Sequence, residues 1–169
     1  MLLEGLSFED FSLGQPFQTL KRTITETDLV NFVTLCGFFE PLFLDRSYAE
    51  TETLFQKPIV PGALTLAYAE GLSLLSGIVH HTGMAFLGLE MKVLHPVCIG
   101  DTIGVEIEVV EKRETKKPDR GIVTFVHRVI NQEGTTVMEY RIQRMIRRRD
   151  TKEDRPDGSV GHAPEESSS

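Results

Sequence analysis

The sequence predicts an α+β domain in which a curved antiparallel β-sheet wraps around one long central helix. Two observations predict this fold class. Residues 61–79 are apolar or small at nearly every position, which is typical of a helix that is buried on all sides. The second half of the chain is then a succession of segments with the alternation of apolar and polar residues that β-strands show. A buried helix followed by consecutive strands favours a sheet packed on a helix.

The elements before the central helix are expected to be short. Residues 17–23 alternate moderately and are expected to form a strand. The run Thr-Glu-Thr-Asp at 25–28 has the spacing of a helix N-cap with a carboxylate in the first turn. It predicts a helix over 28–35, which Gly37 ends.

Asp45 is expected to cap a second short helix over 46–53. The central helix over 61–79 begins with Pro61, which suits the first turn because its missing N–H needs no partner there. A membrane span is the rival interpretation of this apolar segment. It is rejected because the segment barely reaches spanning length and is interrupted by polar residues, at Thr65, Tyr68, Glu70, Ser73 and Ser76.

The strands of the second half are separated by residues that end strands or form turns. Pro96 ends the first of them, the polar loop 116–121 separates two others, and the run Asn-Gln-Glu-Gly at 131–134 predicts a hairpin turn. The strands are expected over 85–93, 103–109, 122–130 and 137–146.

The domain is expected to comprise residues 1–149. Residues 150–169 are rich in charged and small polar residues, a composition that predicts a disordered polar tail. The 169 residues suit a single domain with a sizeable core.

Composition excludes several classes of function. A net charge of −7 argues against a nucleic acid partner. The two cysteines, Cys36 and Cys98, make neither a disulfide framework nor a zinc motif and are expected to be buried thiols. His80 and His81 lack a third ligand at a suitable spacing, so no metal is expected. The chain start shows no targeting pattern, and we expect a cytoplasmic protein without a membrane segment.

The segment 36–49 carries the most specific pattern of the chain. It resembles the loop signature Gly-Asp-x-Asn-Pro-Leu-His, followed by Ala, of the MaoC-like (R)-specific enoyl-CoA hydratases. Gly37, Pro41, Leu42 and Ala49 stand in register with that signature. The resemblance extends over about residues 8–146, and its further matching segments are 8–14, 22–26 and 96–101. It implies the hotdog fold, which agrees with the α+β pattern.

The same loop departs from the signature at the residues that carry the family's chemistry. Phe38 stands in place of the Asp, Glu40 in place of the Asn and Phe43 in place of the His. In the family, the Asp and His together activate a water molecule and supply a proton to the substrate. A phenyl ring has no exchangeable proton and no lone pair. The resemblance therefore implies a protein of the hydro-lyase family that lacks the catalytic Asp and His, and we assign no catalytic residue.

The family's third catalytic contribution comes from the backbone rather than from a side chain. A backbone N–H at the start of the long helix holds the thioester oxygen, commonly from the Gly of a His-Gly pair. Here the pair is Pro61-Gly62, so the resemblance implies that Gly62 binds an acyl thioester. The alternative, that this pair only starts the helix, stays open. The acyl pocket is expected to contain Phe38, Phe39, Phe43 and Pro61.

Glu40 is the candidate substitute for the lost dyad. A pocket lined by phenyl rings would raise the pKa of its carboxyl group by desolvation. The alternative is an ordinary solvated loop residue. His95 and His127 lie at a strand end and within a strand, where a histidine is more often structural than catalytic.

Arginines gather at the end of the last strand, at Arg144, Arg147, Arg148 and Arg149. The first three are candidate ligands for the phosphates of coenzyme A, although a solvated strand end explains the cluster equally well. The resemblance implies a coenzyme A thioester as ligand or substrate and no other cofactor. An acyl carrier protein presents the same pantetheine arm, so the carrier stays open.

These observations favour a MaoC-like hotdog protein that binds acyl thioesters without the usual dyad, as the non-catalytic subunit of an enoyl-CoA hydratase or dehydratase. It is expected to form a homodimer, or a heterodimer with another hotdog subunit. Two alternatives stay open. One is an active enoyl-CoA hydratase or acyl-CoA thioesterase that uses Glu40 and Gly62. The other is a ligand-sensing or purely structural hotdog subunit.

Overall fold

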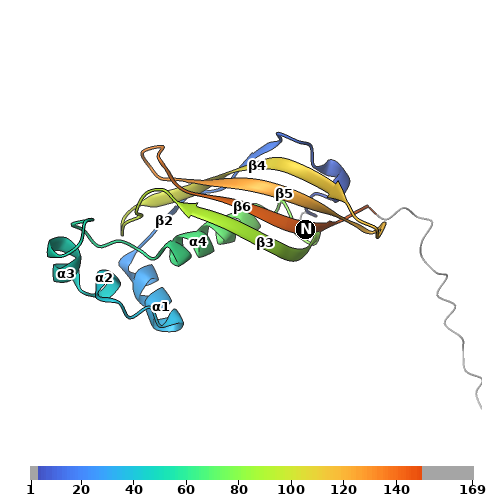
Figure 1. The fold of residues 1–169 in the computed structure, drawn as a ribbon. Helices are drawn as coiled ribbons and strands as arrows, with labels where there is room; N and C mark the ends of the chain where they lie inside the picture. The colour runs from blue at the N-terminus through green and yellow to red at the C-terminus, as the bar shows by residue number, and fades with distance from the viewer. Residues whose placement is uncertain (1–3, 150–169) are drawn as a thin grey trace, which may run out of the picture.

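The computed structural model of the chain describes residues 4–149. Its elements follow one another along the chain as η1 (Phe8–Asp10), β1 (Pro16–Gln18), β2 (Arg22–Thr23), α1 (Glu26–Cys36), α2 (Pro41–Leu44), α3 (Arg46–Thr51), α4 (Gly62–Leu75), β3 (Gly83–Val93), β4 (Thr102–Glu114), β5 (Arg120–Ile130) and β6 (Thr136–Arg147). Figure 1 shows the sheet curving over α4. The predicted α+β arrangement is confirmed. The predicted tail at 150–169 lies outside the described residues.

The sheet is antiparallel throughout and has the order β1-β4-β5-β6-β3, with β2 also paired to β4. The β5–β6 connection is the predicted hairpin turn, in which the Asn131 N–H donates to the Thr135 carbonyl at 3.0 Å. Gly134 supplies the positive φ of 81° that this turn requires. The strand order leaves β3 at one edge of the sheet, paired on only one side.

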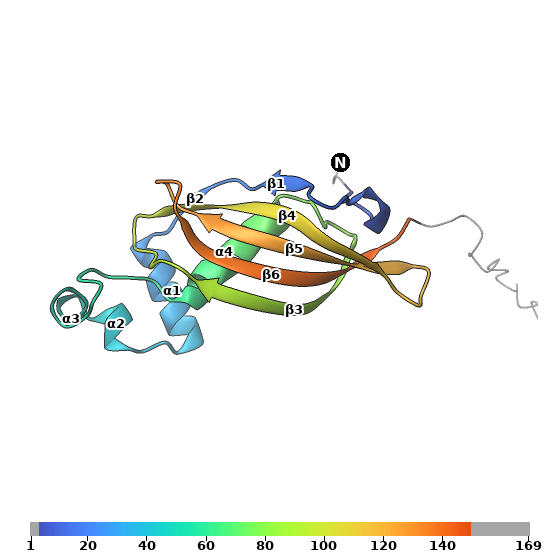
Figure 2. The same ribbon diagram turned by 45° about the horizontal axis from the view of Figure 1, so that its top comes forward.

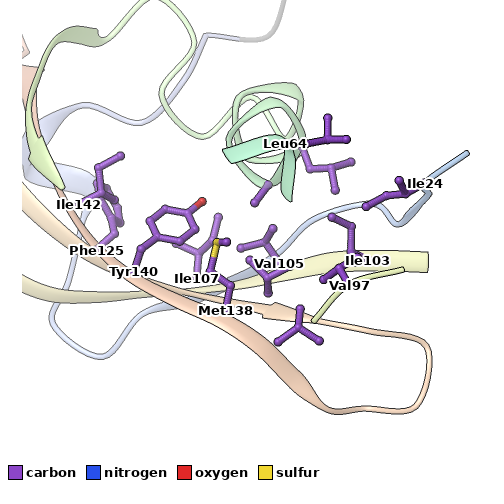
Figure 3. Close-up of a cluster of buried hydrophobic side chains, with 14 of the residues drawn as sticks. Ile24, Leu64, Val97, Ile103, Val105, Ile107, Phe125, Met138, Tyr140 and Ile142 are labelled. Atoms are coloured by element: carbon purple, nitrogen blue, oxygen red, sulfur yellow. The ribbon is translucent and has the colours of Figure 1, made fainter. Parts of the chain in front are cut away.

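The core lies between α4 and the face of the sheet toward it. Every second residue of the predicted strands points into this core, and Figure 3 shows these side chains gathered against α4. From α4, Leu64 and Ala69 are at most 1% exposed. From the sheet, the buried side chains include Ile103, Val105, Ile107, Phe125, Met138, Tyr140 and Ile142.

The helices α1, α2 and α3 lie beyond one end of the sheet, near the N-terminal end of α4 (Figure 2). The predicted capping motif of α1 is confirmed. Thr25 Oγ1 accepts from the Asp28 N–H at 3.3 Å, and Asp28 Oδ2 accepts from the Thr25 N–H at 2.8 Å. Gly37 ends α1 in the left-handed conformation, with φ of 72°. Asp45 caps α3 as predicted, by accepting from the Tyr48 N–H at 3.0 Å.

Three details of the sequence prediction need correction. The expected strand at 17–23 is two short strands, because the chain leaves the sheet between β1 and β2. The expected helix at 61–79 ends at Leu75 and is not buried on all sides, since Leu74 is 53% exposed and Leu75 is 70% exposed. Of the two cysteines, Cys98 is buried as expected but Cys36, in the last turn of α1, is exposed.

Within residues 4–149 no helix has both the length and the apolar character needed to cross a membrane.

Candidate functional site

The candidate site begins at the start of α4. Pro61 is the N-cap residue, with φ of −55° and ψ of 138°, and its carbonyl accepts from the N–H groups of Leu64 and Thr65 at 3.0 and 3.2 Å. Gly62 is the first helical residue, where an N–H group has no partner within the helix. This N–H lies at the end of the helix that carries partial positive charge. It is therefore suited to an acceptor from outside the helix, such as a carbonyl oxygen.

Gly62 also packs closely against the sheet. A Cβ atom at this position would lie 3.3 Å from Cγ2 of Val93 on β3. The absence of a side chain thus lets the first turn of α4 approach the edge strand.

A cavity of about 330 Å³ opens at this helix end. Its walls come from α2, the segment before α4, the first turns of α4, the end of β3 and the start of β6. The lining is mostly apolar, with Thr65 and His95 as its polar side chains, and consists of Phe43, Phe55, Ile59, Val60, Pro61, Gly62, Thr65, Val93, Leu94, His95, Pro96, Val97, Val137 and Met138. A cavity of this size and character suits a small apolar group.

The loop expected to carry the chemistry reaches this cavity through Phe43. Phe43 is in α2 and lines the cavity beside Gly62. The ring of Phe38 lies 6.4 Å from the ring of Phe43, centroid to centroid, and 5.4 Å from that of Phe32. Phe38 and Phe39 are outside the lining, and Phe39 is 66% exposed. The prediction that all three loop phenylalanines line the pocket is therefore corrected to Phe43 alone, with Phe38 behind it.

Glu40 occupies the N-cap position of α2, and its side chain makes no capping hydrogen bond. Its backbone holds the loop instead: its N–H donates to the Phe38 carbonyl and its carbonyl accepts from the Phe43 N–H, both at 2.9 Å. The side chain is exposed, whereas the predicted catalytic role required it to lie in an apolar pocket. It does not line the cavity.

His95 lies closer to Gly62 than the sequence pattern suggested. It follows the end of β3, its N–H donates to the Val137 carbonyl at 3.1 Å, and it lines the same cavity as Gly62. Sequence reasoning treated it as a structural strand residue. The signal that could have found it is its place directly before Pro96, in a turn that faces the start of α4.

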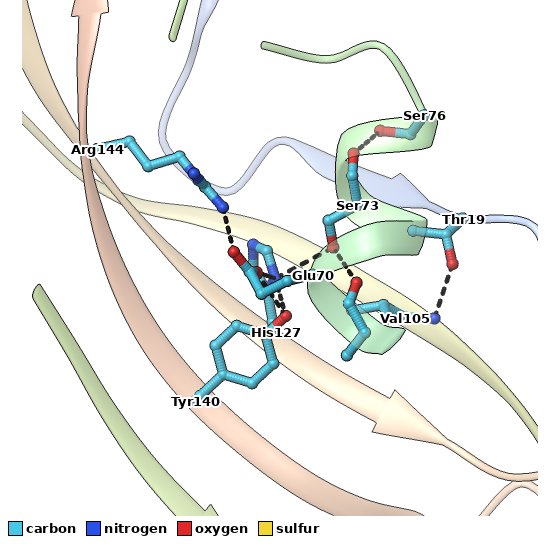
Figure 4. Close-up of polar contacts among 9 residues, drawn as sticks. Thr19, Glu70, Ser73, Ser76, Val105, His127, Tyr140 and Arg144 are labelled. Atoms are coloured by element: carbon cyan, nitrogen blue, oxygen red, sulfur yellow. Dashed lines mark hydrogen bonds and ion pairs between the residues drawn. The ribbon is translucent and has the colours of Figure 1, made fainter. Parts of the chain in front are cut away.

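A second group of polar side chains lies deeper, between α4 and the sheet (Figure 4). Glu70 of α4 forms an ion pair with Arg144 of β6. Tyr140 Oη donates to Glu70 Oε1 at 2.8 Å, and His127 Nδ1 lies 2.7 Å from Tyr140 Oη. Because the hydroxyl proton of Tyr140 is directed to Glu70, the His127 Nδ1–H donates to the Tyr140 oxygen. These four residues are called the buried polar cluster below.

Burial fixes the charge state of this cluster. Burial, reinforced by the Arg144 charge, lowers the pKa of His127 to about 3, so the imidazole is neutral at pH 7. Burial together with the Glu70 carboxylate raises the pKa of Tyr140 above its usual range. The cluster is therefore a directly paired carboxylate and guanidinium, with neutral Tyr140 bonded to the carboxylate and neutral His127 bonded to Tyr140. Sequence reasoning missed it, although Glu70 within an apolar helix was its signal.

The position of α1 is fixed to α4 by a third polar contact. Asp28 Oδ1 accepts from Tyr68 Oη of α4 and from the Arg22 guanidinium, both at 2.7 Å. Burial opposes ionisation of Asp28, but hydrogen bonds from Tyr68 and Thr25 and the Arg22 charge outweigh it and lower its pKa to about 2. This contact holds the N-terminal end of α1 against the middle of α4.

With this geometry established, comparison with known proteins identifies the family. Residues 10–131 match the model of the MaoC like domain. The chain belongs to the MaoC-like domain family. It is 33% identical over 129 residues to an (R)-specific enoyl-CoA hydratase of Aeromonas caviae, which covers 76% of this chain and 90% of that protein.

Solved structures agree with this family assignment. The monoamine oxidase regulatory protein of Archaeoglobus fulgidus superposes with a TM-score of 0.80 at 36% identity, over 88% of this chain and 98% of that one. A Mycobacterium tuberculosis protein described as a double hotdog fold superposes with a TM-score of 0.74 at 22% identity, over 93% of this chain and 47% of that one. The predicted hotdog fold of this MaoC-like domain is thereby confirmed.

The arginines expected to bind coenzyme A phosphates do not face the Gly62 cavity. Met138 lines that cavity near the start of β6, whereas Arg147 ends the strand, about 30 Å away at roughly 3.4 Å per residue. Arg144 is paired with Glu70, and Arg148 with Glu9 and Glu114. None of these arginines lines the cavity at Gly62, and the binding of coenzyme A phosphates by Arg144, Arg147 and Arg148 stays a prediction.

The described part of this MaoC-like domain, residues 4–149, contains no group of three or more His, Cys, Asp or Glu side chains arranged to hold a metal ion. His80 and His81 lie next to each other, with ring centroids 4.0 Å apart, after the end of α4.

Proposed function

We propose that this MaoC-like domain binds acyl thioesters, with coenzyme A as the carrier, at the start of α4 and lacks hydratase chemistry of its own. It would act as the non-catalytic subunit beside an active hotdog protein. The single observation that carries this proposal is the position of Phe43, whose phenyl ring lines the same cavity as Gly62. The start of α4 retains the Gly62 N–H as a donor. The side chain that shares the cavity with it, Phe43, has no exchangeable proton.

The binding half of the proposal rests on Gly62. Hydrogen-bond donors at a helix start stabilise a carbonyl oxygen that gains negative charge. The cavity in front of Gly62 is apolar and large enough for a short acyl group. Support for the ligand class comes from the Aeromonas caviae relative, whose name describes it as an enoyl-CoA hydratase.

The absence of hydration rests on the two rings. Phe38 and Phe43 are in contact distance of each other, at 6.4 Å between centroids, at the loop positions where a proton-transferring pair would be needed. Neither ring transfers protons, and Phe43, which lines the cavity, occupies space that the attacking water would need.

The edge strand β3 supports pairing with a second hotdog subunit. A long unpaired edge with exposed apolar side chains is a template for another strand. On β3 the exposed fractions are 57% for Phe86, 42% for Leu87 and 55% for Val93. Such a partner would lie next to Val93, which packs on Gly62, and could therefore complete the acyl site.

One observation favours a second candidate function. His95 lines the cavity beside Gly62, and a single histidine is able to serve as both acid and base. In this alternative the protein is an enzyme in its own right that uses His95 in place of the loop dyad. Glu40 is a weaker candidate for that role because it is exposed and outside the lining.

Thermal denaturation with saturated and unsaturated acyl-CoAs, compared with free coenzyme A, tests the proposal. A ligand that binds only the folded state raises the midpoint, and at one concentration a tighter ligand raises it more, because the stabilisation grows with the logarithm of the ratio of ligand concentration to Kd. We expect acyl-CoAs to raise it by several degrees more than coenzyme A does, without turnover. Turnover that the His95→Ala substitution abolishes would support the second candidate. If acyl-CoAs do not change the midpoint of denaturation, a structural or sensing role remains.

A further inference from the structure

The buried polar cluster is unusual because it places two charges beneath the sheet. The side chains of Glu70 and Arg144 are only 20% and 13% exposed, and Tyr140 and His127 are at most 2% exposed. A buried ion pair contributes little to net stability, since apolar residues of similar volume do as well or better. Stability alone therefore gives no reason for charges at this place.

The cluster lies directly beyond the Gly62 cavity. On α4, Thr65 lines the cavity and Glu70 follows five residues later, which is about 7.5 Å along a helix. On β6, Met138 lines the cavity and Tyr140 is two residues farther along the same face, which is about 7 Å along a strand. Two independent elements thus place the cluster about 7 Å from the cavity.

An uncovered apolar strip connects the cavity to the cluster. Val93 pairs with Met138 and Met91 pairs with Tyr140, and side chains of directly paired residues lie on the same face of a sheet. Val93 is 55% exposed and Met91 is 39% exposed on this face. The path from Gly62 along β3 and β6 is therefore apolar until it meets Tyr140, Glu70 and Arg144.

We propose that the buried polar cluster is the far wall of the acyl-binding channel and restricts this protein to short-chain acyl thioesters. This inference rests on the proposed function, because it assumes that the thioester oxygen binds at Gly62. The cluster lies about 7 Å from the cavity lining and about 12 Å along α4 from Gly62, distances that an extended acyl chain covers with about six to nine carbons. A longer chain would have to displace solvent from a charged pair without replacing its hydrogen bonds, which is strongly unfavourable.

The test compares butyryl-CoA and decanoyl-CoA, at equal concentrations below micelle formation, as stabilisers of the full-length protein. The wild type is expected to bind butyryl-CoA at least tenfold more tightly than decanoyl-CoA. In the double variant Glu70→Ala with Arg144→Leu, both charges are removed together, and Tyr140 is free to donate its proton to His127 Nδ1. This variant is expected to gain at least tenfold in affinity for decanoyl-CoA.

A surface double variant, Glu133→Ala with Arg113→Leu, makes the same change of charge at exposed positions and should leave both affinities unchanged. Equal wild-type affinity for the two chain lengths would overturn the chain-length inference while leaving the proposed function intact. Absence of binding to either acyl-CoA would overturn both. A cluster variant that folds without gaining affinity for decanoyl-CoA would overturn the cluster as the wall. If the variant does not fold, the wild-type comparison still tests the chain-length restriction.

Discussion

Gly62 contributes two properties to the candidate site, a free backbone N–H and the absence of a side chain. Its N–H is free because it begins a helix, and its lack of a side chain allows the close approach to Val93. Every substitution adds a side chain, but only proline also removes the N–H. The conformation of Pro61 offers a way to separate them.

Replacing Gly62 by Pro removes the N–H without breaking α4. Proline is favoured at the first helical position, and the ψ of 138° at Pro61 is the conformation that a residue before proline adopts. We expect Gly62→Pro to fold and to lose the thermal shift that butyryl-CoA produces in the wild type. Gly62→Ala is the matched control, because it adds the same contact with Val93 but keeps the N–H. Equal shifts in the two variants would show that this N–H does not bind the ligand.

His127 makes folding stability depend on pH. Its pKa is lowered from about 6.5 in the unfolded chain to about 3 in the folded protein. The unfolded state therefore binds more protons, and the stability contributed by the neutral imidazole is present above pH 6.5 and lost as the pH falls toward 3. Between pH 7 and 5.5 the expected loss is about 1 kcal/mol.

Urea denaturation at these two pH values measures this loss. The variant His127→Asn keeps a donor near the position of Nδ1 but does not titrate, so it should lose about 1 kcal/mol less than the wild type over the same interval. Identical losses in the two proteins would mean that the imidazole is not held neutral by burial.

Among the elements, the loop from Gly37 to Asp45 can keep its conformation without the family's catalytic Asp and His. Its shape depends on Gly37 ending α1, on Pro41 beginning α2 and on Asp45 capping α3. None of these contacts uses the side chain at position 38, 40 or 43. The residues that define the loop geometry are thus separate from those that would perform catalysis.

This separation predicts that the chemistry can be restored. The triple variant Phe38→Asp, Glu40→Asn and Phe43→His should fold, because the capping residues are unchanged. A general acid–base group contributes about 10² to 10⁴ in rate, so hydration of crotonyl-CoA should rise at least 100-fold above the wild-type background. The variant Phe39→Asp, at an exposed neighbouring position outside the cavity, is the control and should show no gain. A folded triple variant that binds acyl-CoA yet shows no gain would mean that positions 38 and 43 do not face the thioester.

The helices and strands show where sequence patterns suffice and where they do not. The caps at Thr25, Gly37 and Asp45 were predictable because each depends on residues close in sequence. The burial of α4 was overestimated, because an apolar helix surface gives no sign of which face the sheet leaves uncovered. The pairing of Glu70 with Arg144 joins residues 74 apart and has no local signature.

The same limit applied to the candidate site. The loop motif indicated Phe43 and the family resemblance indicated Gly62, and the two share a cavity in the structure. The loop sequence also suggested Phe39 as a pocket residue, but the direction in which its side chain leaves the loop is not given by the motif. His95 enters the cavity through a turn after β3. Its place directly before Pro96 is a sequence signal for that turn, but the element that the turn faces depends on the fold.

For the whole molecule, the surface left uncovered is as informative as the core. The edge strand β3 exposes apolar residues on both faces, and Leu74 and Leu75 of α4 are exposed as well. A soluble monomer rarely presents such a continuous apolar surface. Pairing through β3 would cover it and close the strip that leads from Gly62 to the buried polar cluster.

Sedimentation equilibrium tests this pairing. The wild type is expected to have twice the mass of one chain when purified alone, or to pair stably when a second hotdog subunit is supplied. Charges on an edge strand oppose strand pairing, so Phe86→Lys with Leu87→Lys should yield monomers in both experiments. Leu13→Lys, at a residue that is 67% exposed and lies away from β3, should leave the assembly unchanged. An unaltered assembly in the β3 variant would place the interface elsewhere.

The most direct measurement is a calorimetric titration of the protein with crotonyl-CoA, followed by mass analysis of the ligand recovered from the cell. The account predicts saturable binding and recovery of crotonyl-CoA without the added mass of water. Recovery of the hydrated thioester at a rate that depends on protein concentration would contradict it, as would a titration without heat of binding at any temperature tried.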